Sequence, residues 1–186
     1  TWGEGAIPIG ERTSAATEHI LDMGASVVAA AGAPWVVRRM DLVGYAKLTT
    51  TNVSTTGAKA ITMTPISNTA ANVDRYANGE GLRAFVASYA TMGANAPTMV
   101  MTYTNSAGTP GKTTTSGIVS TAAAPSGIIL NSGNAANKVG PFLNLAAGDT
   151  GIKDIESLTW GGTAHASGSV FIGLCKPLCM PIPVPA

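Results

Sequence analysis

The stretch that most constrains the fold is residues 98–120, TMVMTYTNSAGTPGKTTTSGIVS. Its first seven residues alternate with a period of two, which is typical of a strand with one buried face. We expect Met99, Met101 and Tyr103 to face a core. The residues expected to face solvent or a neighbour are Thr98, Thr102 and Thr104.

Residues 105–111 join this strand to the β-branched residues 113–120 and combine Asn, Ser, two Gly and a Pro, which is turn chemistry. The stretch therefore predicts a β-hairpin. Further short strands, punctuated by Gly, Pro and Asn, are predicted at residues 35–48, 60–64, 82–89, 152–160 and 169–174. Gly44 suggests a bulge within the first of them. With little helical period, this pattern predicts an all-β chain with one β-sandwich or jelly-roll domain.

The two ends of the chain differ from this middle part. We expect residues 1–30 to form an N-terminal arm, extended or partly helical, and residues 31–178 to form the domain. Residues 179–186 form a tail with Pro181, Pro183 and Pro185, and we expect these prolines to prevent regular strand pairing.

Charge is scarce in this chain. Only 11% of the residues are charged, against about 25% in an average soluble domain, and the net charge is +1. Such a surface offers little electrostatic repulsion and favours association with other protein. The basic residues are scattered, and the longest mostly apolar run, residues 27–37, is too short to span a bilayer, so we expect neither nucleic acid nor a membrane as partner.

Two glycine-rich motifs invite a nucleotide-binding interpretation. Residues 106–113, SAGTPGKT, differ from a phosphate-binding loop only in Ser106, but Thr, Ser and Gly follow where that chemistry needs a helix. Residues 79–84, GEGLRA, have no apolar strand immediately before them and no acid between Glu80 and Asp149. We therefore expect a hairpin loop and a turn, and no bound cofactor.

Two sets of polar residues invite interpretation as chemical sites. Asp154 and Glu156 lie two apart, a spacing open to acid–base chemistry but more typical of a solvated face. Cys175 and Cys179, with His165 ten residues before the first, lack four zinc ligands at suitable spacing. Free thiols are expected, with a disulfide formed after release from the cell as the alternative. We predict no catalytic residue, no metal ligand and no enzymatic activity.

Three segments occur in an order that resembles small virion structural proteins of tailed bacteriophages, the capsid decoration or cement proteins. The segments are DLVGYAKL (residues 41–48), DRYANGEGLRAFV (74–86) with YTNSAGTPGKTTT (103–115), and PFLNLAAGDTGIKDIESLTW (141–160) followed by LCKPLCMPIP. The resemblance covers residues 35–183. It implies a β-sandwich or jelly roll that binds the major capsid protein on the outside of an assembled shell, as a homotrimer, after synthesis in the host cytoplasm.

The two ends carry isolated large apolar residues that a partner could accept. These are Trp2, Ile7, Ile9, Met180, Ile182 and Val184. We expect them to reach neighbouring subunits or the shell, or else to fold back over their own domain edge. The alternative function is a receptor- or glycan-binding jelly-roll module of a phage tail or head fibre, and a carbohydrate-active enzyme using Asp154 and Glu156 ranks third.

Overall fold

The computed structural model describes residues 35–37, 40–65, 76, 78–115, 118–120, 122–130, 141–178 and 182–184. The chain divides into two compact units. One comprises Thr1–Val37 with Ile182–Ala186, and the other comprises Arg38–Pro181.

The described part of the first unit is a two-stranded sheet. Strand β1 (Trp35–Val37) pairs antiparallel with β11 (Ile182–Val184), and Val36 lies opposite Pro183. The expectation that the tail prolines prevent strand pairing is therefore wrong. In an antiparallel strand, only alternate residues donate their backbone N–H to a given neighbouring strand. A strand with a single partner therefore tolerates a proline, which lacks an N–H, at the positions that do not donate to that partner.

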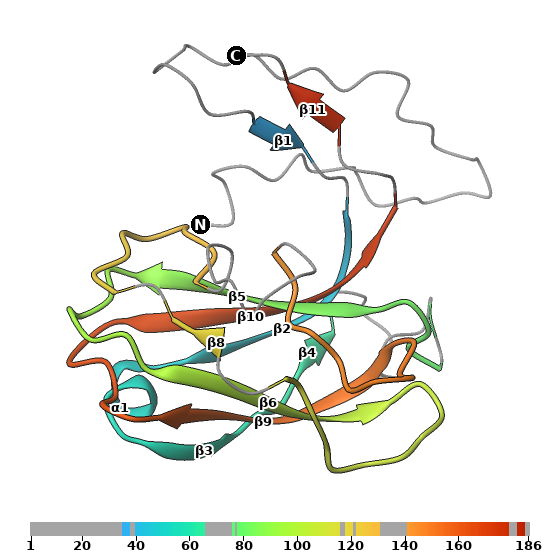
Figure 1. The fold of residues 1–186 in the computed structure, drawn as a ribbon, viewed down its shortest axis with the longest axis horizontal. Coiled ribbons are helices and arrows are strands. Elements are labelled where there is room, and N and C mark those ends of the chain that lie inside the picture. The colour runs from blue at the N-terminus through green and yellow to red at the C-terminus, as the bar shows by residue number, and fades with distance from the viewer. Residues whose placement is uncertain are drawn as a thin grey trace. The chain divides into compact units, whose positions relative to one another are not determined.

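The second unit consists of two antiparallel sheets, which confirms the all-β class (Figure 1). The first sheet has the order β4-β2-β10-β5, and the second has the order β3-β9-β6-β7, with β8 also paired to β6. The elements are β2 (Met40–Leu48), α1 (Thr50–Val53), β3 (Gly57–Ala60), β4 (Thr64–Pro65), β5 (Arg83–Ala90), β6 (Thr98–Asn105), β7 (Lys112–Thr113), β8 (Ile118–Val119), β9 (Ile152–Gly161) and β10 (Ser169–Pro177).

One hydrophobic cluster receives side chains from both sheets. On β6, Met99, Met101 and Tyr103 are fully buried, while the alternate residues Thr98, Thr102 and Thr104 are partly exposed, as the alternation predicted. The bulge expected at Gly44 is confirmed, because Leu174 pairs with Gly44 and Cys175 pairs with Leu42.

The predicted hairpin is confirmed, with its return strand in two pieces. Strands β7 and β8 pair with opposite ends of β6. Between them, Thr114 is buried, and its hydroxyl accepts a hydrogen bond of 2.9 Å from the backbone N–H of Met101. This side-chain bond supports the backbone where the regular ladder stops.

The strand predicted at residues 60–64 is wrong. Residues 57–60 pair with β9 in one sheet, and residues 64–65 pair with β2 in the other. The chain therefore crosses between the sheets at residues 61–63. Ile61 and Met63 pack against the core during this crossing, so their alternation arises from burial without a strand.

Three connections gather at one end of the two sheets. Leu48 of β2 pairs with Val170, and Ala90 of β5 pairs with Ser169, so both strands end where β10 begins. Likewise β3 and β6 begin where β9 ends, because Trp160 pairs with Gly57 and Gly161 pairs with Thr98. Residues 49–56, 91–97 and 162–168 thus leave the same end of the sheets, where Figure 1 shows α1.

Candidate functional site

The predicted anchor residues fall mostly outside the described part of the chain. Trp2, Ile7, Ile9 and Met180 belong to segments that the structure does not describe. Ile182 and Val184 lie on β11, and their backbones pair with β1. Their role as anchors stays a prediction.

The SAGTPGKT motif forms the hairpin loop between β6 and β7. Lys112 and Thr113, where a phosphate-binding loop would start its helix, form strand β7 and pair with Tyr103 and Thr102. The loop is tied to its surroundings by side chains, because Asn105 Oδ1 accepts from the N–H of Thr109 at 2.9 Å. The loop prediction is therefore confirmed.

The GEGLRA motif forms a tight turn before β5, as predicted. Gly79 and Gly81 both have positive φ, at 69° and 72°. A side chain on Gly79 would overlap the carbonyl oxygen of Ile152, so the close approach of two backbones requires glycine here.

Asp154 and Glu156 have separate local partners. The register between β6 and β9 shifts so that Glu156 is the extra residue of a bulge. Glu156 Oε1 accepts hydrogen bonds from the Thr104 hydroxyl at 2.8 Å and from the N–H of Gly111 at 3.0 Å. The Asp154 residue is exposed, but its carboxylate has lost part of its hydration. This desolvation, together with the charge of Glu156, raises the pKa of Asp154. The Glu156 carboxylate on β9 thus holds the β6–β7 loop in place through these two hydrogen bonds.

Cys175 is a buried free thiol, as expected. Its Sγ lies 3.6 Å from both the Met40 sulfur and the Arg83 carbonyl oxygen. Burial, together with the charge of Asp41, raises the pKa of Cys175 to about 12, so the thiol stays protonated at neutral pH. Cys179 lies outside the described residues. Within the described ranges, no group of three or more His, Cys, Asp and Glu residues is placed to hold a metal ion.

Three segments at this end of the sheets, residues 91–97, 122–127 and 162–168, are joined to one another by hydrogen bonds. Gly93 donates its N–H to the Ser167 carbonyl at 3.0 Å and accepts from the N–H of Ala123 at 2.9 Å. Asn95 Nδ2 donates to the Ala164 carbonyl at 2.7 Å. Residues 122–127, which follow β8, are therefore bonded to the β5–β6 connection, and that connection is bonded to the β9–β10 connection. Together they form one surface that is already ordered in the free protein. We call residues 49–56, 91–97, 122–127 and 162–168 the loop end.

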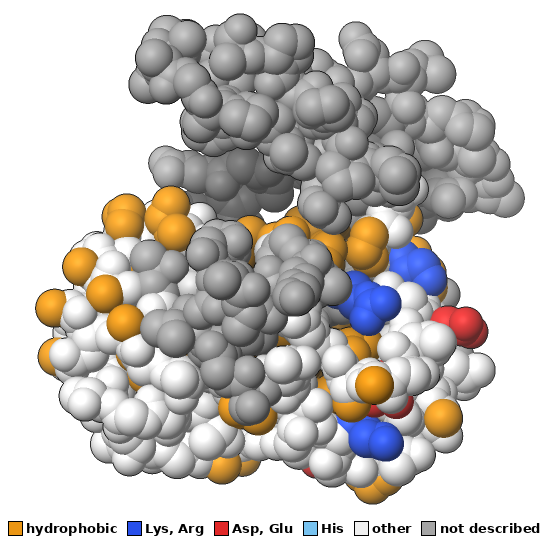
Figure 2. All heavy atoms as spheres, in the orientation of Figure 1, with side chains coloured by type: hydrophobic (Ala, Val, Ile, Leu, Met, Phe, Trp, Pro, Cys, Tyr) orange, Lys and Arg blue, Asp and Glu red, His pale blue; other side chains and the backbone are white. Residues whose placement is uncertain are grey.

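The loop end contains no Asp, Glu, Lys or Arg. Its exposed residues are Thr, Ser, Ala, Gly and Pro. Two lysines border it from strand positions, Lys47 over the Tyr89 ring and Lys59 bonded to the Thr56 carbonyl. On the face seen in Figure 2, the charged side chains gather on the right, and the left part over α1 shows only uncharged ones.

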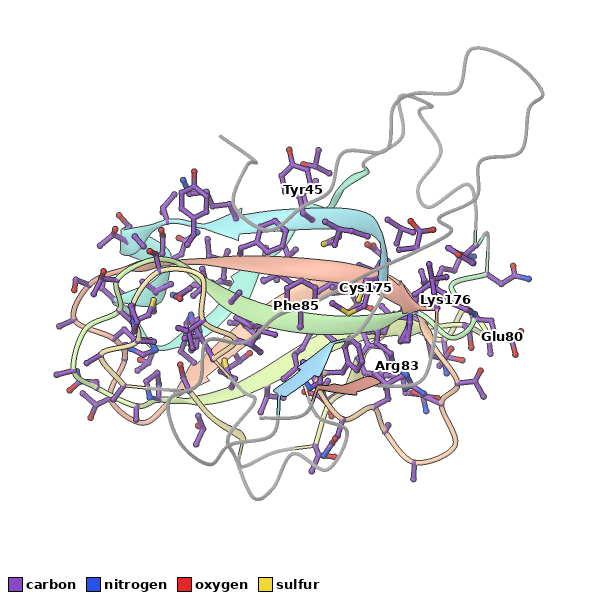
Figure 3. The ribbon with its side chains drawn as sticks, turned by 90° about the horizontal axis from the view of Figure 1, so that it is seen from above. Tyr45, Glu80, Arg83, Phe85, Cys175 and Lys176 are labelled. Carbon is purple, nitrogen blue, oxygen red and sulfur yellow. The ribbon has the colours of Figure 1, made fainter. Side chains whose placement is uncertain are left out.

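Charged residues concentrate at the opposite end of the strands. Register places Arg83 beside Cys175 and Asp41 beside Lys176, and Lys176 Nζ donates to the Glu80 carbonyl at 2.7 Å (Figure 3). Lys112, Asp149, Lys153 and Asp154 belong to the same end, since Thr104 near the end of β6 pairs with Asp154. Among the described residues, charged side chains therefore concentrate at this end of the strands, which we call the charged end, and the loop end has only Lys47 and Lys59 at its border.

Comparisons with protein-family models, curated proteins and solved structures find no match for this chain. The described residues also include no helix with the length and apolar character needed to cross a bilayer. The loop end is thus identified from geometry alone. Sequence reasoning missed it, although each of its segments is visibly free of charge, because only the strand register shows that the segments meet.

Proposed function

We propose that this chain is a non-enzymatic virion structural protein that binds the outer surface of a bacteriophage capsid and stabilises it. In this proposal the protein is made in the host cytoplasm, acts as a homotrimer on the virion, and has the major capsid protein as its partner. The observation that supports it best is the preassembled loop end without charged residues.

The chemistry of the loop end suits contact with protein. Burying a charge costs several kcal/mol unless it is paired, and Lys, Glu and Asp are depleted at interface cores. Thr, Ser, Ala and Gly lose little side-chain entropy on burial. Because hydrogen bonds already order three of its four segments, the surface loses less further freedom on binding.

The finer fold that we propose is a jelly roll. Strand order supports it, because β10 lies between β2 and β5 while β9 lies between β3 and β6. At the edge of the second sheet, both β7 and β8 pair with β6. At the edge of the first sheet, Ile129 forms an isolated bridge with Ala87 of β5. A four-stranded and a five-stranded antiparallel layer with interleaved strand order suit this architecture, in which two sheets pack together.

The terminal segments supply a second set of contacts in this proposal. Each large apolar side chain that a neighbour buries contributes about 1.5–3 kcal/mol, less the cost of ordering the segment. The anchors are Trp2, Ile7, Ile9, Met180, Ile182 and Val184. In a trimer, several weak anchors act together through avidity.

Copy number on purified particles tests the function directly. We expect imaging of intact virions to show hundreds of copies on the head. A handful of copies at a tail or fibre tip would instead favour the receptor- or glycan-binding module and overturn the proposal. Deleting residues 1–10 or 180–186 tests the anchors separately: undiminished binding of both truncated forms to undecorated shells would exclude them.

A further inference from the structure

A buried Ser–His pair lies beneath the loop end. The Ser120 hydroxyl oxygen lies 2.9 Å from Nε2 of His165, although 45 residues separate them in sequence. His165 is fully buried and Ser120 is 2% exposed. The imidazole also meets the indole of Trp160 edge to face, with ring centroids 5.6 Å apart. Both polar residues are thus shielded from solvent inside the fold.

The other ring nitrogen of His165 has no hydrogen-bond partner among the described residues. The backbone carbonyls of Gly93 and Asn95 lie close enough to favour the protonated ring, but neither meets hydrogen-bond geometry with Nδ1. The neutral ring suits this buried site whichever nitrogen carries its proton. A second proton would place a positive charge inside the fold, away from water, and burying an unpaired charge is costly.

Among the described residues that the structure places against the ring, none offers a compensating charge. The elements around it are Trp160, residues 91–97, residues 118–120 and its own connection, residues 161–168. None of them contains Asp, Glu, Lys, Arg, Tyr or Cys. His165 is therefore the one titratable side chain within these segments.

The pair occupies the junction of the loop end. His165 belongs to the β9–β10 connection, whose Ser167 and Ala164 carbonyls accept from Gly93 and Asn95. Ser120 follows β8, and its N–H donates to the Pro97 carbonyl at 2.8 Å. The β5–β6 connection, the β9–β10 connection and the residue after β8 thus all lie next to the His165 imidazole.

We infer that His165 is an acid-sensitive latch of the loop end. The neutral ring holds the β9–β10 connection against Ser120, and uptake of a second ring proton from solvent releases that connection. The released connection loses its bonds to Gly93 and Asn95, so residues 91–97, 122–127 and 162–168 of the loop end loosen while the two sheets persist. This inference needs only the fold, and it stands or falls independently of capsid binding.

The direction of the pH effect follows from burial. Desolvation lowers the pKa of His165 below its ordinary value of 6.5, more than the Gly93 and Asn95 carbonyls raise it. The unfolded or opened ring then binds a proton more readily than the closed one. The latch is therefore fully closed above about pH 6.5 and weakens as pH falls below it.

Hydrogen exchange of individual amides on the full chain tests the latch. After correction for intrinsic rates, we expect the amides of Gly93 and Ala123 to lose at least about tenfold protection between pH 7.5 and pH 5. The Leu143 amide, bonded to the Ala84 carbonyl, serves as the internal control and keeps its protection. Equal pH dependence at all three amides would overturn the inference.

Three variants separate titration from packing. His165→Gln places an amide near the position of Nε2 without a titratable group, and it should abolish the acid response. Ser120→Ala should loosen the loop end at pH 7.5 yet keep an acid response, which covers the case in which His165→Gln fails to fold. His19→Gln, which removes the other histidine, should behave as the unchanged protein. An acid response that persists in His165→Gln, or disappears in His19→Gln, would contradict the latch.

Discussion

The Tyr103 hydroxyl donates a hydrogen bond of 2.7 Å to Oδ2 of Asp149, and this contact joins the buried face of β6 to the connection before β9. The other carboxylate oxygen accepts from Asn105 Nδ2 at 2.8 Å, and the Tyr103 hydroxyl accepts from the N–H of Ala146 at 2.9 Å. Burial first, and then the Asp149 bond, raise the pKa of Tyr103 to about 12. The bonds from Tyr103 and Asn105 lower the pKa of Asp149.

Tyr103→Phe removes this contact while keeping the ring. We expect it to lower the free energy of unfolding by about 1.5–3 kcal/mol, the range for a hydrogen bond to a charged group. Because the pKa of Tyr103 rises on folding from 10.0 to about 12, the difference between the two proteins is largest between neutral pH and pH 10 and shrinks as pH rises toward 12. It also shrinks at acid pH, where Asp149, whose pKa the Tyr103 bond lowers, takes up a proton. Denaturant unfolding at several pH values measures it. A difference that does not change with pH would contradict this account.

Opposite faces of β6 should respond differently to a new charge. Met101 is fully buried and Thr102 is partly exposed. Met101→Asp should prevent folding, because an unpaired buried carboxylate costs at least about 3–5 kcal/mol. Thr102→Asp should leave a folded protein with a nearly unchanged melting temperature. Comparable melting of both variants by circular dichroism would show that the assignment of faces is wrong.

Lys112 should have no role in nucleotide binding, since it lies on strand β7. Millimolar ATP with magnesium should leave the melting temperature unchanged, because a ligand stabilises only the state it binds. Lys112→Ala should fold normally. A rise of several degrees with ATP that this variant abolishes would restore the phosphate-binding interpretation.

Cys175 should resist alkylation in the folded protein. A buried thiol whose pKa is about 12 carries almost no thiolate at pH 8. In a Cys179→Ala variant, which retains Cys175 alone, iodoacetamide should label the chain only after denaturation. Rapid labelling of the native variant would be inconsistent with the buried site.

Local patterns predicted much of the fold. The alternation of Met99, Met101 and Tyr103 identified the buried face of β6, and Gly44 marked the bulge in β2. Local patterns failed where long-range contacts decide. Ile61 and Met63 alternate because they pack on the core while crossing between sheets. Pro183 is accommodated because β11 pairs with a single strand, β1, among the described residues.

The candidate site was less predictable than the fold. Ser120 follows β8 and His165 follows β9, and both strands pair with the same end of β6. This shared pairing brings the two residues within hydrogen-bond distance. The uncharged loop end likewise depends on strand neighbours that no local pattern specifies. Conversely, Asp154 and Glu156 looked paired in sequence, but a bulge on β9 gives them separate partners.

The measurement that tests the central claim most directly is binding to undecorated shells by matched charge variants. Ala94→Glu and Thr163→Glu place a carboxylate on the loop end, and Ala107→Glu and Thr109→Glu place one on the β6–β7 loop at the charged end; all four positions are exposed. With equal melting temperatures for all four variants, we predict that the first pair loses at least about tenfold in affinity, because docking would bury an unpaired charge. The second pair should bind as the unchanged protein does. Full binding by both loop-end variants would contradict the account.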